Sequence, residues 1–182
     1  MRIITGKYKG HLLDSLRDNN VRPATDRVKG TIFNMLQNRL SLLDTHVLDL
    51  FAGIGSLGFE ALSRGAADVV FVDENRHVLD TIHSNAQRLG CEECCYVLQT
   101  DALMFIGQSN DQFDLIFADP PYVYTETSRL PHLIFQRKLL KSEGFLIIEH
   151  DKRTIFEPSE LYRLAVQKEF GNTRISFFIH PS

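Results

Sequence analysis

The chain has 182 residues, of which 43% are hydrophobic, and this is enough to bury one full core but not two. We therefore expect a single domain over residues 1–182. No run approaches the roughly 20 apolar residues of a membrane span, and the opening MRIITGKYKG lacks the apolar stretch of a signal peptide. These features favour a cytoplasmic protein without a membrane partner.

The formal net charge of −3 argues against nucleic acid as a partner, because phosphate binding relies on clustered Lys and Arg. The distribution of charge weakens that argument. Residues 1–39 hold eight Lys or Arg against three Asp, whereas residues 40–182 hold twelve against twenty acidic residues. This asymmetry indicates a basic arm on an acidic body, although a fluctuation of solvated surface charge would give the same count.

Residues 1–23 form the predicted basic N-terminal extension. Arg2, Lys7, Tyr8, Lys9 and His11 interleave basic and aromatic side chains, a composition that suits RNA phosphates and unstacked bases. Lysines also protect exposed edge strands from pairing with other chains. The sequence leaves both interpretations open.

The predicted elements begin with a helix over residues 25–40, where Val28, Ile32, Leu36 and Leu40 fall on one stripe. Short apolar runs then alternate with stretches of helical period, which is typical of βαβ units with a parallel sheet. The strands are predicted at 45–51, 68–73, 95–99, 114–119 and 144–150, with a helix at 76–89. Residues 162–170 and 174–180 flank a turn at Gly171 and predict an antiparallel hairpin. The fold class is therefore α/β, a doubly wound Rossmann-like sheet.

A glycine-rich loop follows the first predicted strand. That strand contains Asp49, and Gly53, Gly55 and Gly58 then spell G-x-G-x-x-G before a helical stretch. Glycines let the chain turn sharply and let a ligand lie against bare backbone near a helix N-terminus. The loop predicts a nucleotide-like cofactor, unless the glycines serve only the turn and the packing of helix on strand.

Acidic residues end the second and third predicted strands. Asp73, with Glu74 as a substitute, is placed to accept hydrogen bonds from both ribose hydroxyls of an adenosine cofactor. Asp101, followed by Ala102, is placed to accept from the adenine amine. Either acid would also cap the helix that follows it. Up to this point a nicotinamide-dependent dehydrogenase fits nearly as well as a methyltransferase.

The fourth predicted strand ends in Asp119-Pro120-Pro121-Tyr122. The exocyclic amine of guanine or adenine is a poor nucleophile, because its lone pair is delocalised into the ring. If the Asp119 carboxylate and the Pro120 carbonyl each accept one N–H, the lone pair can turn toward a methyl donor. Tyr122 offers a ring on which a flipped-out base can stack, worth roughly 1–3 kcal/mol. An ordinary Asp-Pro turn is the alternative.

These motifs, in this order, resemble those of the DPPY-type class I S-adenosylmethionine-dependent methyltransferases. Over nearly its full length the chain is similar to the RsmD family, which methylates the N2 amine of a guanine in small-subunit (16S) ribosomal RNA. The resemblance rests on the segments RIITGKYKG at 2–10, RPATDRV at 22–28, DLFAGIGSLGFEALSRGA at 49–66 and DPPY at 119–122, together with the closing hairpin.

The resemblance implies S-adenosylmethionine as the cofactor and ribosomal RNA or the small ribosomal subunit as the partner. The amine chemistry requires no metal, and we expect a monomer. Thr25 and Arg27 would border the active site. By this likeness Gly53, Gly55, Asp73 and Asp101 would hold the cofactor, and Asp119, Pro120, Pro121 and Tyr122 would hold the target base. We also expect Asp49 and Ala102 in the cofactor site, and RNA contact by Arg2, Lys7, Lys9, Arg22, Thr25 and Arg27.

Three other functions stay open on the sequence alone: an adenine-N6 methyltransferase acting on DNA or RNA, a nicotinamide-dependent dehydrogenase, and a non-catalytic RNA-binding module. The CEECC segment, with Cys91, Cys94 and Cys95, offers one Cys-x-x-Cys pair. A structural zinc site needs four ligands and the chain holds no second pair, so we interpret these thiols as inert.

Overall fold

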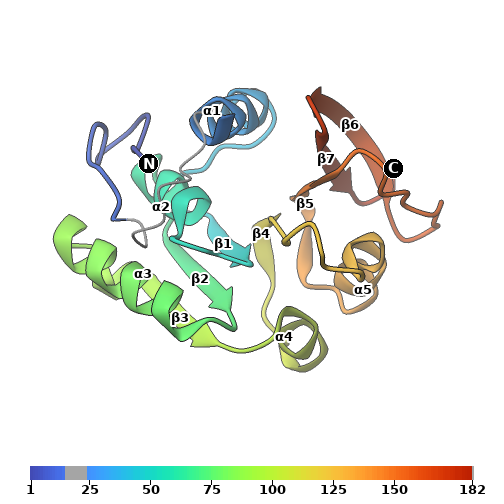
Figure 1. The fold of residues 1–182 in the computed structure, drawn as a ribbon. Coiled ribbons are helices and arrows are strands. Elements are labelled where there is room, and N and C mark those ends of the chain that lie inside the picture. The colour runs from blue at the N-terminus through green and yellow to red at the C-terminus, as the bar shows by residue number, and fades with distance from the viewer. Residues whose placement is uncertain (15–23, 182) are drawn as a thin grey trace.

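The computed structural model describes residues 1–14 and 24–181 and shows a seven-stranded sheet with the order β3-β2-β1-β4-β5-β7-β6 (Figure 1). Five strands are parallel, and β7 runs antiparallel to both β5 and β6. The strands are β1 (His46–Leu50), β2 (Asp68–Asp73), β3 (Cys95–Gln99), β4 (Phe113–Ala118), β5 (Leu140–Asp151), β6 (Arg163–Phe170) and β7 (Thr173–Ile179). The predicted doubly wound sheet with a closing antiparallel hairpin is confirmed.

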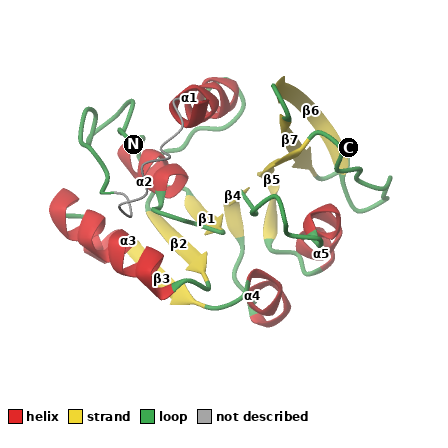
Figure 2. Ribbon diagram, viewed as in Figure 1, coloured by secondary structure: helices red, strands yellow, loops and turns green. Residues whose placement is uncertain are grey.

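Helices cover both faces of the sheet (Figure 2). One buried cluster packs α1 (Ala24–Leu36), α2 (Ser56–Ser63) and α3 (Arg76–Leu89) against the sheet, and a second cluster packs α4 (Ala102–Gln108) and α5 (Leu130–Gln136) on the other face. Two short 3-10 helices, η1 (Glu92–Cys94) and η2 (Thr127–Arg129), lie in the connections. None of the helices in the described part of the chain is long and apolar enough to cross a membrane.

Helix α3 shows how the sequence sets an element. Its apolar stripe of Leu79, Ile82 and Ala86 is at most 5% exposed, because the 3.6-residue period turns all three toward the sheet. The Asn75 side chain caps its start by accepting a hydrogen bond from the backbone of the first turn, and Gly90 ends it at φ 64°. The helix predicted at 76–89 is therefore confirmed at both ends.

The closing hairpin is also close to its prediction. Gly171 turns the chain at φ 60°, and β6 and β7 pair from Phe170 and Thr173 outward. The predicted first helix is shorter than expected, since α1 ends at Leu36 rather than at residue 40. Strand β5 is longer, because Leu140 pairs with Phe113 through an irregular register before the regular pairing begins at Phe145.

Residues 1–14 fold back on themselves and pack onto the body of the protein. Arg2 and Leu12 form an isolated antiparallel bridge outside the sheet, so the edge-strand interpretation is wrong. Ile3, Tyr8 and Leu13 are at most 8% exposed. Burial removes the Tyr8 ring from solvent, so in this structure the aromatic residue of the arm is not open to an unstacked base.

Helix α2 holds this N-terminal arm by its polar side chains. The Glu60 carboxylate accepts hydrogen bonds from the backbone N–H groups of Ile4 (2.7 Å) and Thr5 (3.1 Å). The Ser63 hydroxyl accepts from the Tyr8 backbone N–H at 2.9 Å and donates to the Thr5 carbonyl. Backbone groups that a loose tail would leave to water are thus satisfied by the body.

Candidate active site

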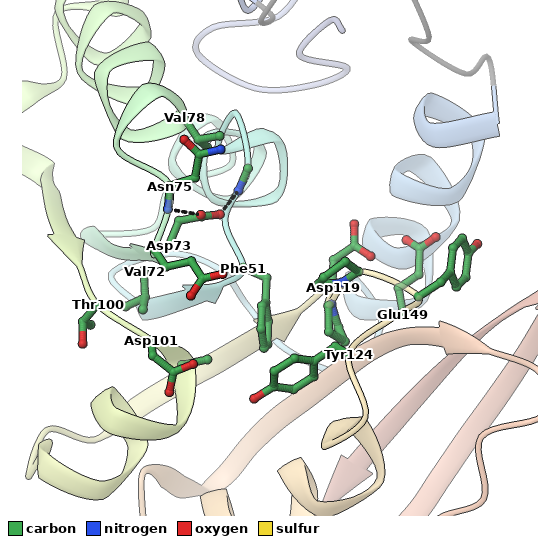
Figure 3. A pocket seen from close by; sticks show the side chains of 16 residues that line it. Phe51, Val72, Asp73, Asn75, Val78, Thr100, Asp101, Asp119, Tyr124 and Glu149 are labelled. Carbon is green, nitrogen blue, oxygen red and sulfur yellow. Dashed lines mark hydrogen bonds between the residues drawn. The ribbon is translucent and has the colours of Figure 1, made fainter. Parts of the chain in front are cut away.

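A cavity of about 550 Å³ opens at the carboxyl ends of strands β1 to β5. Strands β1 and β4 are neighbours in the sheet, and the chain winds outward from them in opposite directions, which is where open α/β sheets bind ligands. Figure 3 shows the side chains that line the cavity. The structure brings together nine residues singled out from the sequence: Gly53, Asp73, Glu74, Asp101, Ala102, Asp119, Pro120, Pro121 and Tyr122.

The glycine loop uses its three glycines differently. Gly53 and Gly55 take left-handed backbone with φ of 54° and 79°, and Gly55 is the N-cap of α2. At Gly58 an added Cβ would lie 2.3 Å from a ring carbon of Phe71, so only glycine lets α2 pack this closely on β2. The turn and packing roles are thus real, and Gly53 also lines the cavity.

Asp49 supports the loop from beneath. It is 2% exposed, and one carboxylate oxygen accepts a hydrogen bond from the Gly58 N–H at 3.0 Å. Burial raises the pKa of Asp49 well above its ordinary value, an effect that the nearby Asp119 adds to. Asp49 and Gly55 are not among the described residues that line the cavity, so their direct contact with a cofactor stays a prediction.

Asp73 ties the second strand to the glycine loop. Its carboxylate accepts hydrogen bonds from the Gly53 N–H (3.0 Å) and from the Asn75 N–H (2.9 Å), as the dashed lines in Figure 3 show. The cap of α3 is Asn75, so the capping alternative for Asp73 is wrong. A carboxylate has about four acceptor sites, and two therefore remain for ribose hydroxyls.

Asp101 does cap a helix. Its side chain accepts a hydrogen bond from the Met104 N–H at 3.0 Å at the start of α4. Asp101 and Ala102 nevertheless line the cavity, and the carboxylate keeps acceptor capacity toward it. Capping and ligand contact are compatible here.

Two aromatic residues that the sequence analysis did not select form one wall. Phe51 and Tyr124 meet edge to face with ring centroids 4.9 Å apart, and Phe51 has an unusual positive φ of 57°. The Tyr124 hydroxyl is buried and, within the described residues, has no hydrogen-bond partner. Burial and the negative charges of Asp101 and Glu126 raise the pKa of Tyr124 to about 12, which keeps it a donor. A buried donor without a partner in a cavity wall suits a ligand acceptor.

Asp119 stands at the end of β4. Solvent reaches its side chain, but protein surrounds the carboxyl group closely, and this desolvation raises the pKa of Asp119 to about 6. Pro120 is buried and fixes the backbone beside it. Tyr122 is 58% exposed, and its hydroxyl contacts the Thr173 hydroxyl on β7, which steadies a ring that remains open to solvent.

A second acid, Glu149, lies beside Asp119 and was missed in the sequence. Ala118 pairs with Ile148 across β4 and β5, so the next residue on each strand meets the other at the rim of the cavity. Desolvation first, and then the charge of Asp119, raises the pKa of Glu149 to about 8. Figure 3 shows the two side chains together. The rule used for Asp73 and Asp101, an acid at a carboxyl strand end, would have found it.

Four of the predicted RNA-binding residues, Arg2, Lys7, Lys9 and Arg27, are not among the residues that line this cavity. The side chains of Arg2, Lys7, Lys9 and Arg27 are exposed. Arg22 lies outside the described residues, and Thr25 belongs to α1 by its backbone. Met1 lines a smaller cavity of about 50 Å³ together with Asp119 and Glu149, so the basic arm begins next to the acid pair. Among the described residues, no three His, Cys, Asp or Glu side chains are grouped to hold a metal.

The sheet order, the glycine loop at β1 and the Asp-Pro-Pro-Tyr segment after β4 define a class I, S-adenosylmethionine-dependent methyltransferase. Residues 1–179 match the family described as conserved hypothetical protein 95, the RsmD family, and the chain belongs to it.

Named relatives cover nearly the whole chain. A Bacillus subtilis protein named "Putative rRNA methyltransferase YlbH" is 38% identical over 182 residues, 98% of each chain. "Ribosomal RNA small subunit methyltransferase D" of Haemophilus influenzae is 35% identical over 94% of this chain and 89% of its own. The solved structure "Putative methyltransferase yhhF" from Escherichia coli has a TM-score of 0.87 at 28% identity, covering 100% of this chain and 98% of that one.

Proposed function

We propose that this protein transfers a methyl group from S-adenosylmethionine to the exocyclic N2 amine of a guanine in small-subunit ribosomal RNA, in the cytoplasm. The observation that carries the proposal is Asp119-Pro120 at the rim of the cavity, next to the glycine loop. The family and the names of the relatives support ribosomal RNA as the substrate. Family membership also disfavours the dehydrogenase alternative.

The cavity fits the cofactor by its size and by its donor and acceptor groups. Its volume of about 550 Å³ lies within the range for small-molecule sites. The free acceptor sites of Asp73 suit ribose hydroxyls, those of Asp101 suit the adenine amine, and the unpartnered Tyr124 hydroxyl suits an acceptor on the same ligand. Bound there, S-adenosylmethionine supplies an activated methyl group on a sulfonium.

The chain's own residues prepare the amine. The Asp119 carboxylate and the Pro120 carbonyl each accept one amine N–H, which turns the nitrogen lone pair toward the cavity. When the nitrogen gains the methyl group it becomes positively charged and must lose one proton. Asp119, with its pKa raised to about 6, can hold that proton and release it to solvent. These residues supply orientation and proton acceptance without a metal.

We assign RNA contact to exposed basic side chains of the N-terminal extension and of α1. Arg2, Lys7, Lys9 and Arg27 are exposed. With Arg22 and Thr25 they would hold phosphates, and residues 1–23 would be the RNA-contacting extension of the single domain. The exposed Tyr122 ring would stack on the flipped-out base, worth roughly 1–3 kcal/mol.

The test is transfer of labelled methyl from S-adenosylmethionine to small ribosomal subunits and to naked RNA, both from cells that lack this protein. We expect labelled N2-methylguanosine on nucleoside analysis. Label in N6-methyladenosine would show instead that the target is the N6 amine of an adenine. Absence of label on both substrates, with S-adenosylmethionine binding demonstrated by calorimetry, would overturn the RNA substrate.

A further inference from the structure

The turn that follows β5 presents two exposed cations at the same end of the sheet as the cavity. Strand β5 ends at Asp151, two residues after Glu149, which lines the cavity. Lys152 and Arg153 come next, and the side chains of both are exposed. The proposed chemistry gives neither of them a role.

A backbone hydrogen bond places this turn beside Tyr122, the residue on which the target base would stack. The Lys152 N–H donates to the Asn172 carbonyl at 2.9 Å. The next residue, Thr173, pairs with Asp151 across β5 and β7. The Thr173 hydroxyl contacts the Tyr122 hydroxyl. The turn and the exposed ring are therefore joined through two adjacent residues of the closing hairpin.

The contacts within the turn fix one cation and leave the other without a counter-charge. Asp151 accepts from Arg153 Nε at 2.9 Å and from Nη2 at 3.0 Å, so the edge of the guanidinium formed by Nη1 and Nη2 remains available. Arg153 lowers the pKa of Asp151 to about 2, and the pair stays ionised. Lys152 has no carboxylate partner within the described part of the chain. One acid thus faces two cations.

We propose that Lys152 and Arg153 bind a phosphate of the RNA backbone next to the target base. The inference rests on the proposed methylation of ribosomal RNA and adds a contact on the hairpin side of the cavity. A base that leaves its stack moves together with its backbone, so cations beside Tyr122 lie where the flanking phosphates pass. The guanidinium edge suits two phosphate oxygens, and the ammonium adds a point charge.

This contact is separate from the RNA-binding residues predicted in the sequence. Those residues belong to the N-terminal extension and to α1, whereas Lys152 and Arg153 lie between β5 and β6. Phosphate contacts fix the register and orientation of a nucleic acid on a protein. Contacts from two different elements would restrict how the RNA approaches Asp119.

The experiment measures methyl transfer to small ribosomal subunits and to naked small-subunit RNA, both from cells that lack this protein, over a range of salt concentrations. For Lys152→Ala we expect kcat/KM to fall roughly 3- to 30-fold at physiological salt, as for loss of a charged hydrogen bond that solvent partly screens. The slope of log kcat/KM against log salt should become shallower by about 1, because one phosphate contact is lost. Calorimetry should find an unchanged affinity for S-adenosylmethionine.

A second variant separates the guanidinium from net charge. Asp151→Asn combined with Arg153→Ala removes the ion pair and leaves the net charge of the turn as it was. We expect kcat/KM to fall by a similar factor, because the Nη1 and Nη2 donors are gone. Lys152→Arg, which keeps the charge, should retain most of the wild-type rate.

Lys138→Ala is the matched control. It removes an exposed lysine just before the amino end of β5, which is the opposite end of the strand from the turn. Both its kcat/KM and its salt dependence should equal those of the wild type.

Wild-type rates and salt dependence in Lys152→Ala and in the double variant would overturn the phosphate contact and leave the proposed function intact. An equal loss in Lys138→Ala would also overturn it, because the effect would then follow the net charge of the protein. If the wild type transfers no methyl to either substrate, the proposed function fails and this inference fails with it.

Discussion

Replacing Glu60 by glutamine should strongly destabilise the protein. Glu60 is fully buried, and its carboxylate accepts from the Ile4 and Thr5 N–H groups and from the Arg64 guanidinium at 2.9 Å. The ammonium of Lys29, itself 2% exposed, lies 3.7 Å away. Burial lowers the pKa of Lys29, and Glu60 is the first of the charges that oppose this effect.

The magnitude follows from what the substitution leaves unpaired. Glutamine keeps one acceptor oxygen, so its NH₂ group must face either the Ile4 N–H or the Thr5 and Arg64 donors. Lys29 also loses a buried counter-charge. Removing one partner of a buried ion pair costs about 3–5 kcal/mol, a large share of the 5–15 kcal/mol that typically stabilises a domain.

Urea unfolding followed by circular dichroism measures the free energy of unfolding of both proteins. The control is Glu169→Gln, which breaks the exposed pair with Arg174 on the hairpin and should change stability by less than about 1 kcal/mol. A loss below about 1 kcal/mol for Glu60→Gln would refute the view that this carboxylate anchors the arm.

Three further predictions concern the site. Asp119→Asn should abolish most methyl transfer, while calorimetry finds cofactor affinity within about threefold of wild type. In the wild type, methyl transfer should rise as the pH increases through about 6, because only ionised Asp119 accepts the amine. A flat profile between pH 5 and 7 would contradict this role. Tyr124→Phe should weaken cofactor binding up to about tenfold without loss of stability, since the removed hydroxyl has no partner among the described residues. Unchanged affinity would refute a contact between the Tyr124 hydroxyl and the cofactor. Gly58→Ala should cost about 1–3 kcal/mol of stability in urea, because its Cβ would meet the Phe71 ring at 2.3 Å; a neutral substitution would disprove the packing role.

The sequence predicted the elements with strong local signals. Helix α3 has both an apolar stripe and a C-terminal glycine, and the β strands read as apolar runs ending in Asp73 or in Asp119-Pro120. Helices α4 and α5 have seven residues each, too few to show a period, and were not delimited.

The sequence predicted the site residues that belong to a motif. It missed those whose role depends on strand pairing or burial. Glu149 was counted as part of an apolar strand, and only the pairing of β5 with β4 places it beside Asp119. Tyr8 was counted in an arm whose basic and aromatic composition suits phosphates and unstacked bases, but a pattern of residue types does not reveal that this tyrosine is buried. Asp49 and Gly55 belong to the predicted motif and stabilise the glycine loop. Asp49 accepts a hydrogen bond from the Gly58 N–H, and Gly55 is the N-cap of α2.

Helix α2 connects the glycine loop to the N-terminal arm. Its N-cap is Gly55 of the glycine loop, and its Glu60 and Ser63 hold the N-terminal arm. Both contacts lie on one helix about 12 Å long. If RNA contacts the arm as proposed, a shift of the arm on binding would change the position of the glycine loop through this one helix. Such coupling is reciprocal by thermodynamic necessity: by whatever factor RNA changes the affinity for the cofactor, the cofactor changes the affinity for RNA.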